Sequence, residues 1–221
     1  MASVGATRGV LGATSATAFL ALGGQYYLSV TGGEYGFLEE TFRYFGFFTI
    51  LSNIMVAVTT LLLAIDPTRR GPWLSAARLA SLYMISITGV VYHLVLAGDN
   101  NPQGLGWWTN LGTHTVVPIV AVLGWVLVGP RGMFHWDTLL RSLVFPVAWL
   151  AYALTRDAVL SEPTYPFMDV PGLGVPQVAL NLGVIILVGL LLGAAKVGLD
   201  RALHRRRPAP VEADDQVRVE A

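Results

Sequence analysis

Six long apolar stretches, each almost free of charged residues, dominate this chain of 221 residues. Hydrophobic residues make up 54% of the chain and charged residues only 13%, against roughly 25% charged residues in an ordinary soluble domain. A membrane-spanning helix needs about 20 mainly apolar residues. We therefore expect an all-α integral membrane protein, folded as a bundle of six transmembrane helices. The stretches cover residues 9–30, 44–65, 74–97, 109–129, 137–155 and 175–197.

The distribution of positive charge predicts how the spans are oriented. In a six-span arrangement most basic residues fall on one side, whereas the loops on the other side are acidic and have only Arg43 and Arg156 as cations. Cytoplasmic loops carry an excess of Lys and Arg. Both termini are therefore expected in the cytoplasm of a multi-pass cell-membrane protein. The basic side holds Arg8, Arg69, Arg70, Arg78, Arg131, Arg141, Lys196, Arg201 and Arg205 to Arg207.

Two of the stretches have a second interpretation. Residues 137–155 contain Arg141 and Pro146, but arginine can reach the interface, and neighbouring helices can satisfy the backbone groups that a proline frees. Residues 9–30 follow Arg8 and are similar to a secretory signal sequence. We prefer a span, because the run is long for a signal sequence and no clear cleavage site ends it.

The organisation expected is one membrane domain over residues 1–200 and a disordered cytoplasmic tail over residues 201–221, which has too little apolar content to fold alone. The chain has no cysteine, which excludes disulfides, thiolate nucleophiles and thiolate metal sites. Nucleic-acid binding is not expected, since the basic residues flank the membrane and suit anionic headgroups. Gly189 and Gly193 form a small-xxx-small pattern that allows close helix contact, and a homo-oligomer stays an open alternative.

Polar side chains inside the apolar stretches mark where function is expected, because such groups are costly in a bilayer. Thr49 and Asn53 lie one turn apart on the second stretch, and Asn110 and His114 lie one turn apart on the fourth. His93 lies near the outer end of the third stretch. With Thr49 about 10 Å along a helix that begins near residue 42, the three residues Thr49, His93 and His114 converge from three helices in the outer half of the membrane.

A hydroxyl on one helix opposite an imidazole on another is the minimum arrangement for a base-activated nucleophile. Thr49 and His114 are therefore the candidate catalytic pair, and Asn53 and Asn110 are candidate orienting groups or oxyanion donors. A structural alternative stays open, since membrane threonines commonly bond their own i−4 carbonyl and buried His or Asn side chains join helices. No cofactor or metal is expected, because only His93 and His114 share a depth.

Aromatic side chains gather in the outer loops at Trp107, Trp108, Tyr165 and Phe167. Tryptophan and tyrosine are enriched at both membrane interfaces. We therefore interpret these four residues as an outer interfacial belt that anchors the protein in the membrane.

A resemblance to a known family rests on three segments: Phe48-Thr49-Ile50-Leu51-Ser52-Asn53, Asn110-Leu111-Gly112-Thr113-His114-Thr115-Val116-Val117-Pro118 and Tyr165-Pro166-Phe167. In these segments and in the number of spans, the chain resembles the androgen-induced protein family and its bacterial six-span relatives. Animal members look like intramembrane threonine hydrolases that cleave fatty acid esters of hydroxy fatty acids, and the resemblance implies Thr49 as nucleophile and His114 as base. The spacing around Thr49 departs from the animal proteins.

Residues and resemblance together predict an intramembrane hydrolase of lipid esters, with its active site in the outer-leaflet half and a membrane lipid or lipid-like molecule as substrate. Thr49 would attack the ester carbonyl and His114 would accept the hydroxyl proton. A non-catalytic binder or transporter of a small amphipathic molecule is the alternative, and a structural membrane protein is the third reading. The residues expected to bind or orient the substrate are Asn53, Asn110, His93 and Ser52.

Overall fold

The computed structural model describes residues 3–99 and 101–205, and all regular structure within these ranges is helical. Five helical segments of this described part are long and apolar enough to cross a membrane. The expectation of an all-helical, multi-pass membrane protein is confirmed at this level. The five segments are Phe48–Ile65, Pro72–Leu96, Leu105–Val128, Trp136–Leu160 and Val175–Arg205.

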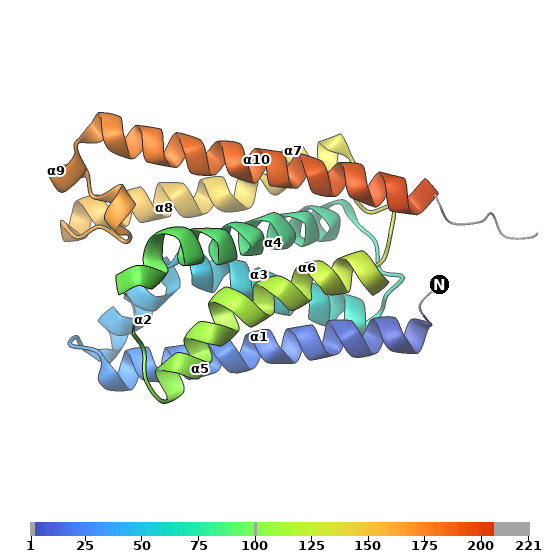
Figure 1. The fold of residues 1–221 in the computed structure, drawn as a ribbon, viewed down its shortest axis with the longest axis horizontal. Coiled ribbons are helices and arrows are strands. Elements are labelled where there is room, and N and C mark those ends of the chain that lie inside the picture. The colour runs from blue at the N-terminus through green and yellow to red at the C-terminus, as the bar shows by residue number, and fades with distance from the viewer. Residues whose placement is uncertain (1–2, 100, 206–221) are drawn as a thin grey trace, which may run out of the picture.

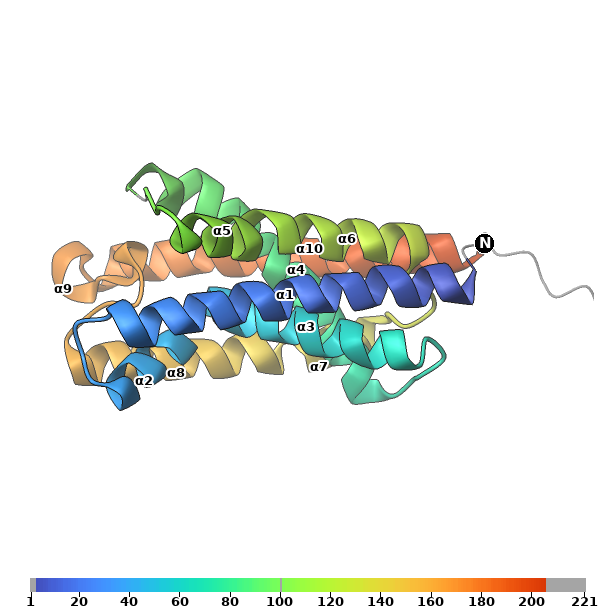
Figure 2. The same ribbon diagram turned by 90° about the horizontal axis from the view of Figure 1, so that it is seen from below.

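The long helices lie side by side along one axis (Figures 1 and 2). They are α1 (Val4–Gly32), α3 (Phe48–Ile65), α4 (Pro72–Val91), α6 (Val117–Val128), α8 (Val144–Leu160) and α10 (Val175–Arg205). Shorter elements are α2 (Phe37–Gly46), α5 (Leu105–Leu111), α7 (Trp136–Ser142), α9 (Val170–Leu173), the π-helices η1 (Tyr92–Leu96) and η3 (Gly112–Val116), and the 3₁₀ turns η2 (Ala97–Asp99) and η4 (Pro166–Met168).

Helix α1 covers the first expected span, residues 9–30, but it is not one of the five segments that meet the length and hydropathy criteria. Its 29 residues extend over about 43 Å at 1.5 Å per residue. The helix lies alongside α3 and alongside the segment formed by α5, η3 and α6 (Figure 2). The N-terminal end of α1 and the C-terminal end of α10 lie at the same end of the bundle (Figure 1).

The second apolar stretch is interrupted where a continuous helix was expected. Phe47 has an extended backbone (φ −75°, ψ 133°) and separates α2 from α3. Helix α2 is amphipathic, and its Arg43 forms ion pairs with Glu39 and with Glu162 of the α8–α10 connection. Thr49 consequently lies in the first turn of α3, and not about 10 Å along a helix that begins near residue 42.

The fifth stretch is divided at Leu143 into α7 and α8. Pro146 has no N–H to donate to the carbonyl of Ser142, four residues earlier. That carbonyl accepts a hydrogen bond of 3.0 Å from the hydroxyl of Tyr83 on α4. A neighbouring helix thus satisfies the backbone group that the proline frees, as membrane-embedded backbone requires.

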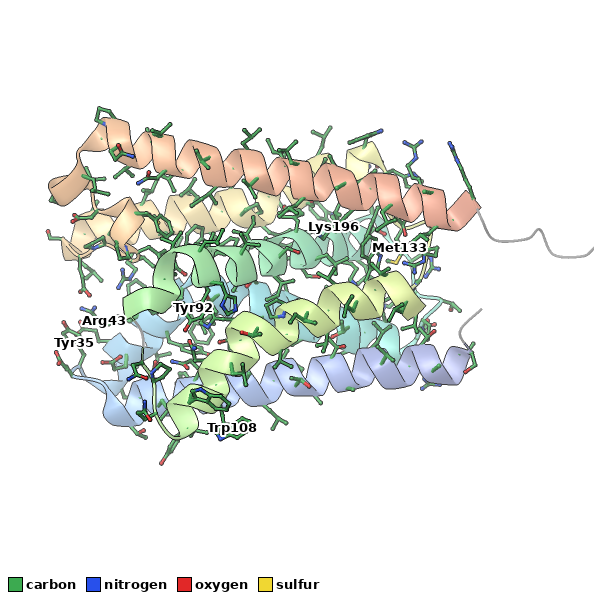
Figure 3. The ribbon with its side chains drawn as sticks, in the orientation of Figure 1. Tyr35, Arg43, Tyr92, Trp108, Met133 and Lys196 are labelled. Carbon is green, nitrogen blue, oxygen red and sulfur yellow. The ribbon has the colours of Figure 1, made fainter. Side chains whose placement is uncertain are left out.

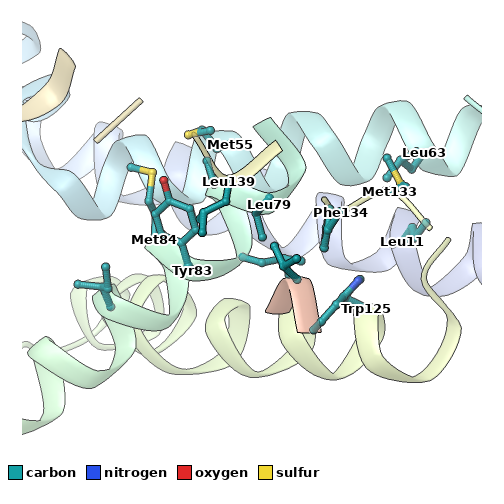
Figure 4. Close-up of a cluster of buried hydrophobic side chains, with 14 residues drawn as sticks. Leu11, Met55, Leu63, Leu79, Tyr83, Met84, Trp125, Met133, Phe134 and Leu139 are labelled. Carbon is teal, nitrogen blue, oxygen red and sulfur yellow. The ribbon is translucent and has the colours of Figure 1, made fainter. Parts of the chain in front are cut away.

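The main apolar cluster joins α1, α3, α4, α6, α7 and α10 (Figure 4). Trp125 and Phe134 are almost fully buried in it, with ring centroids 5.7 Å apart. A Cβ at Gly189 of α10 would lie 3.1 Å from Cδ1 of Ile87 on α4, and one at Gly193 would lie 2.6 Å from Cδ1 of Leu139 on α7. The small-xxx-small pattern therefore serves helix packing within the chain.

Helix α10 continues to Arg205, five residues into the segment expected as a tail. The rest of that expected tail, with Arg206 and Arg207 of the basic cluster, lies outside the described residues.

Candidate active site

Thr49 and His114 lie next to each other although 65 positions separate them in the chain. Oγ1 of Thr49, in the first turn of α3, is 3.2 Å from Nε2 of His114 in η3. This distance is at the long end of the range for a hydrogen bond between a hydroxyl and an imidazole nitrogen. The two candidate catalytic residues are thus in contact, and both are half-buried.

His114 lies in a π-helical turn that its own surroundings explain. Pro118 cannot donate to the carbonyl of His114, four residues earlier, and the N–H of Val117 bonds instead to Gly112, five residues back. A second π-turn, η1, lies opposite on α4 and carries Tyr92 and His93. Single π-turns inside α-helices occur frequently at functional sites.

Hydrogen bonds determine which nitrogen of His114 carries the proton. Nδ1 is 3.2 Å from the backbone carbonyl of Asn110 and 3.0 Å from Oγ1 of Thr113. A carbonyl can only accept, and the Thr113 hydroxyl already donates to the carbonyl of Thr109. We therefore assign the proton to Nδ1, which leaves the lone pair of Nε2 directed at the Thr49 hydroxyl.

Tyr92 holds the imidazole from one face. Its ring stacks on that of His114, with centroids 4.0 Å apart and an interplanar angle of 22°. The side-chain amide of Asn110 donates a hydrogen bond of 2.6 Å to the Tyr92 hydroxyl. Figure 3 shows Tyr92 inside the bundle, between α4 and the α5–α6 segment. Asn110 thus orients His114 twice, through its own carbonyl and through Tyr92.

Asn53 and Ser52 are fully buried behind Thr49. The amide nitrogen of Asn53 donates to the carbonyls of Thr49 (2.8 Å) and Thr113 (3.1 Å), which ties α3 to η3. The Ser52 hydroxyl lies 3.0 Å from the Thr49 carbonyl and 2.8 Å from the hydroxyl of Thr88. Because both N–H groups of Asn53 are engaged, this residue positions the site and has no donor left for an oxyanion.

Tyr165 is a member of the site that the sequence did not reveal. Its hydroxyl accepts a hydrogen bond of 3.0 Å from the backbone N–H of Phe48, beside Thr49. Burial raises the pKa of Tyr165 to about 12, and interactions with Thr49 and Phe48 lower it. The phenol therefore stays protonated at neutral pH and can donate a hydrogen bond. Its position in an outer loop favoured the interfacial-belt interpretation, and the Tyr165-Pro166-Phe167 segment was the one available signal.

His93 lies beside this group, with its ring 5.2 Å from that of Tyr92 between centroids, but it forms no hydrogen bond with Thr49 or His114. Its Nε2 lies 3.0 Å from Oγ1 of Thr115, and its side chain is exposed on the groove between α4 and α6. Within residues 3–99 and 101–205, no three His, Asp or Glu side chains gather closely enough to hold a metal ion.

Two cavities meet at Thr49. The larger, which we call the vestibule, has a volume of about 550 Å³ and lies between α1, α3, η1 and α5. The smaller, which we call the slot, has a volume of about 50 Å³ and lies between α3, α4, α8 and α10. Polar side chains line the vestibule, namely Gln25, Ser29, Asn110, Thr113 and His114. Four residues border both cavities: Thr49, Tyr92, Leu96 and Tyr165.

Comparison of this chain with protein-family models, with curated proteins and with solved structures finds no match. The chemistry of the site therefore has to carry the functional inference.

Proposed function

We propose that this protein is an intramembrane hydrolase of lipid esters, with Thr49 as the nucleophile and His114 as the general base. The observation that carries this proposal is the 3.2 Å contact between Oγ1 of Thr49 and Nε2 of His114, on an imidazole whose other nitrogen faces a backbone carbonyl. Nucleophile, base and a group that orients the base are the three parts of an activated nucleophile. The resemblance to the androgen-induced protein family favours the same two residues.

The reaction proceeds through an acyl-enzyme. Oγ1 of Thr49 attacks the ester carbonyl while its proton moves to Nε2 of His114. The carbonyl oxygen becomes an oxyanion, and the Tyr165 hydroxyl donates a hydrogen bond to it. The C–O bond to the alcohol then breaks, and the alcohol leaves with the proton from Nε2.

Hydrolysis of the acyl-enzyme restores Thr49. A water molecule gives one proton to Nε2 of His114 and attacks the acyl carbonyl. The bond to Oγ1 breaks, the carboxylic acid leaves, and the proton on Nε2 returns to Thr49. The vestibule, at about 550 Å³, has room for this water and for the departing alcohol.

The proposal includes six spans, with both termini in the cytoplasm of a cell-membrane protein. Helix α1 has 29 residues, more than the roughly 20 needed to span a bilayer. The α3–α4 loop at the end of the bundle that holds the N-terminus carries Arg69 and Arg70, as the excess of positive charge in cytoplasmic loops requires. The active site then lies in the outer half of the membrane.

Single cysteines test this topology, because the chain has none of its own. A membrane-impermeant maleimide should label Glu34→Cys on intact cells. It should label Val4→Cys and Thr68→Cys only after permeabilisation. If positions 4 and 34 are both labelled on intact cells, or both only after permeabilisation, α1 does not span the membrane. If position 4 is labelled on intact cells and position 34 only after permeabilisation, the orientation is reversed.

The catalytic assignment is tested with Thr49→Val, Thr49→Ser and His114→Gln, purified in detergent beside the parent protein. A fluorophosphonate probe should label the parent and Thr49→Ser, and the modified peptide should contain position 49. Turnover of long-chain lipid esters should be lost in Thr49→Val and His114→Gln, while their thermal unfolding stays close to that of the parent. Labelling that persists in Thr49→Val would overturn the proposal. Absence of label and turnover in the parent would favour a non-catalytic binder.

A further inference from the structure

The slot on the far side of Thr49 from the vestibule is almost entirely apolar. Around Thr49 and Thr88 its walls are aromatic and aliphatic, with the Trp149 ring packed against Phe48 at a centroid distance of 4.8 Å. The indole N–H of Trp149 donates to the carbonyl of Gly46, so the one polar atom of this slot-lining ring has a partner. The apolar lining is completed by Ile87, Val91, Leu96, Phe167, Leu182 and Ile185.

The slot borders a groove on the outer surface of the bundle. Ile87, Val91, Phe167 and Ile185 line both the slot and a groove of about 440 Å³ between α4 and α10. The two helices lie next to each other (Figure 1). The α10 wall of the groove runs from Leu180 to Val188, about 12 Å along the helix at 1.5 Å per residue.

The groove opens to the surroundings of the bundle. Leu94 of η1 on one wall is 79% exposed and Leu180 of α10 on the other is 61% exposed. In a membrane-spanning bundle, apolar side chains exposed in this way face lipid tails. Vestibule, Thr49, slot and groove therefore lie one after another between a chamber with several polar side chains and the hydrocarbon of the bilayer.

The volumes of the slot and the vestibule indicate which part of an ester each of them can hold. A cavity needs about 10–15 Å³ on this measure to hold one water molecule, so the slot of about 50 Å³ admits a thin apolar chain and no bulky group. The vestibule is about ten times larger and has several polar side chains in its walls. With the carbonyl carbon at Oγ1 of Thr49, the acyl chain enters the slot and the alcohol part stays in the vestibule.

We propose that the slot and groove form an acyl channel, in which one unbranched long acyl chain runs from Thr49 past Trp149 and Ile185 and leaves between α4 and α10 into the bilayer. This inference rests on the proposed function and adds its substrate class, an ester of a long-chain fatty acid with a polar alcohol part. Because the channel ends in lipid and not at a wall, chain length has no upper limit.

The first test measures chain-length dependence with 4-nitrophenyl esters of acids of 4 to 18 carbons. The parent protein should show kcat/KM that rises with chain length and then stays within about two-fold up to 18 carbons. Ile185→Trp, at the junction of slot and groove, should lower kcat/KM for the palmitate ester at least ten-fold and leave the butyrate ester within two-fold. The matched control Ile186→Trp, on the exposed face of α10 and outside both the slot and the groove, should stay within two-fold for both esters.

Retained butyrate turnover shows that Ile185→Trp is folded and that its Thr49 is intact. Equal palmitate turnover in the parent and in Ile185→Trp would overturn the channel. A sharp fall in the kcat/KM of the parent protein above a particular chain length would refute the proposal that the channel opens into the bilayer.

A binding measurement separates failure of the channel from failure of the catalytic proposal. Palmitic acid brominated along its chain should quench the fluorescence of Trp149, measured as the difference between the parent and Trp149→Phe in detergent micelles. The same quenching should appear in Thr49→Val, because binding of the fatty acid requires no catalytic step. Quenching without turnover would keep the channel and refute the hydrolase, and equal quenching of the parent and Trp149→Phe would refute the channel.

Discussion

The backbone carbonyl of Asn110 lies 3.2 Å from Nδ1 of His114, one helical turn away. Because a carbonyl only accepts, this contact leaves Nε2 as the basic nitrogen 3.2 Å from the Thr49 hydroxyl. The orientation of the base is thus built into the same helix that carries it. Four predictions follow from this and related contacts.

Pro118→Ala should lower the reactivity of Thr49 without lowering the stability of the fold. The alanine supplies an N–H for the carbonyl of His114, so the π-turn can relax to a regular α-helix and rotate the imidazole away from Thr49. We expect fluorophosphonate labelling to fall at least ten-fold while the unfolding temperature stays the same or rises. Full labelling would show that the π-turn does not depend on the proline.

Tyr165→Phe should slow the chemical step. Loss of one oxyanion donor lowers kcat by about 10²–10³-fold in hydrolases that use an oxyanion hole, and the proposed mechanism predicts a loss of this size with little change in KM. The lost hydrogen bond should lower the free energy of unfolding by only about 1 kcal/mol. Steady-state kinetics with a long-chain ester measures both constants, with the exposed Tyr27→Phe as control. An unchanged kcat would remove Tyr165 from the reaction.

The Tyr83 hydroxyl should stabilise the break between α7 and α8. Tyr83→Phe leaves the carbonyl of Ser142 without its donor, and we expect a loss of about 0.6–1.7 kcal/mol in the free energy of unfolding. Pro146→Ala restores a backbone N–H, so Tyr83→Phe should cost less in that background. Unfolding in detergent across this double-mutant cycle gives the coupling, and a coupling of zero would contradict the account.

Gly112→Val should separate α1 from η3. A Cβ at position 112 would lie 2.8 Å from the Cβ of Ala21, and overpacking of this kind costs about 1–3 kcal/mol. Gly183→Val is the matched control, because a Cβ there meets nothing within 4 Å. Ala21→Gly should recover part of the lost stability. Equal unfolding temperatures for the position 112 and position 183 variants would show that the two elements are not tightly packed.

Residue type and depth were sufficient to select Thr49 and His114 as candidates, since polar groups in apolar stretches are rare and costly. The same reasoning gave Asn53 and Asn110 no distinct roles. The structure assigns Asn53 to a clamp on two backbone carbonyls and Asn110 to the orientation of the base. Tyr165 escaped selection because a tyrosine in an outer loop is typical of an interfacial anchor.

The sequence by itself determined that this protein is helical and crosses a membrane several times. The length and apolar character of each stretch are local properties, and they are sufficient to favour a helix in a bilayer. Only the tertiary structure decided that Thr49 opens a helix, that a π-turn carries His114, and that a slot leads from Thr49 towards α10. These features depend on the proline-shifted hydrogen bonds and on distances between residues as far apart as Phe48 and Tyr165. Helical periodicity describes one helix at a time and contains no information about the separation of two.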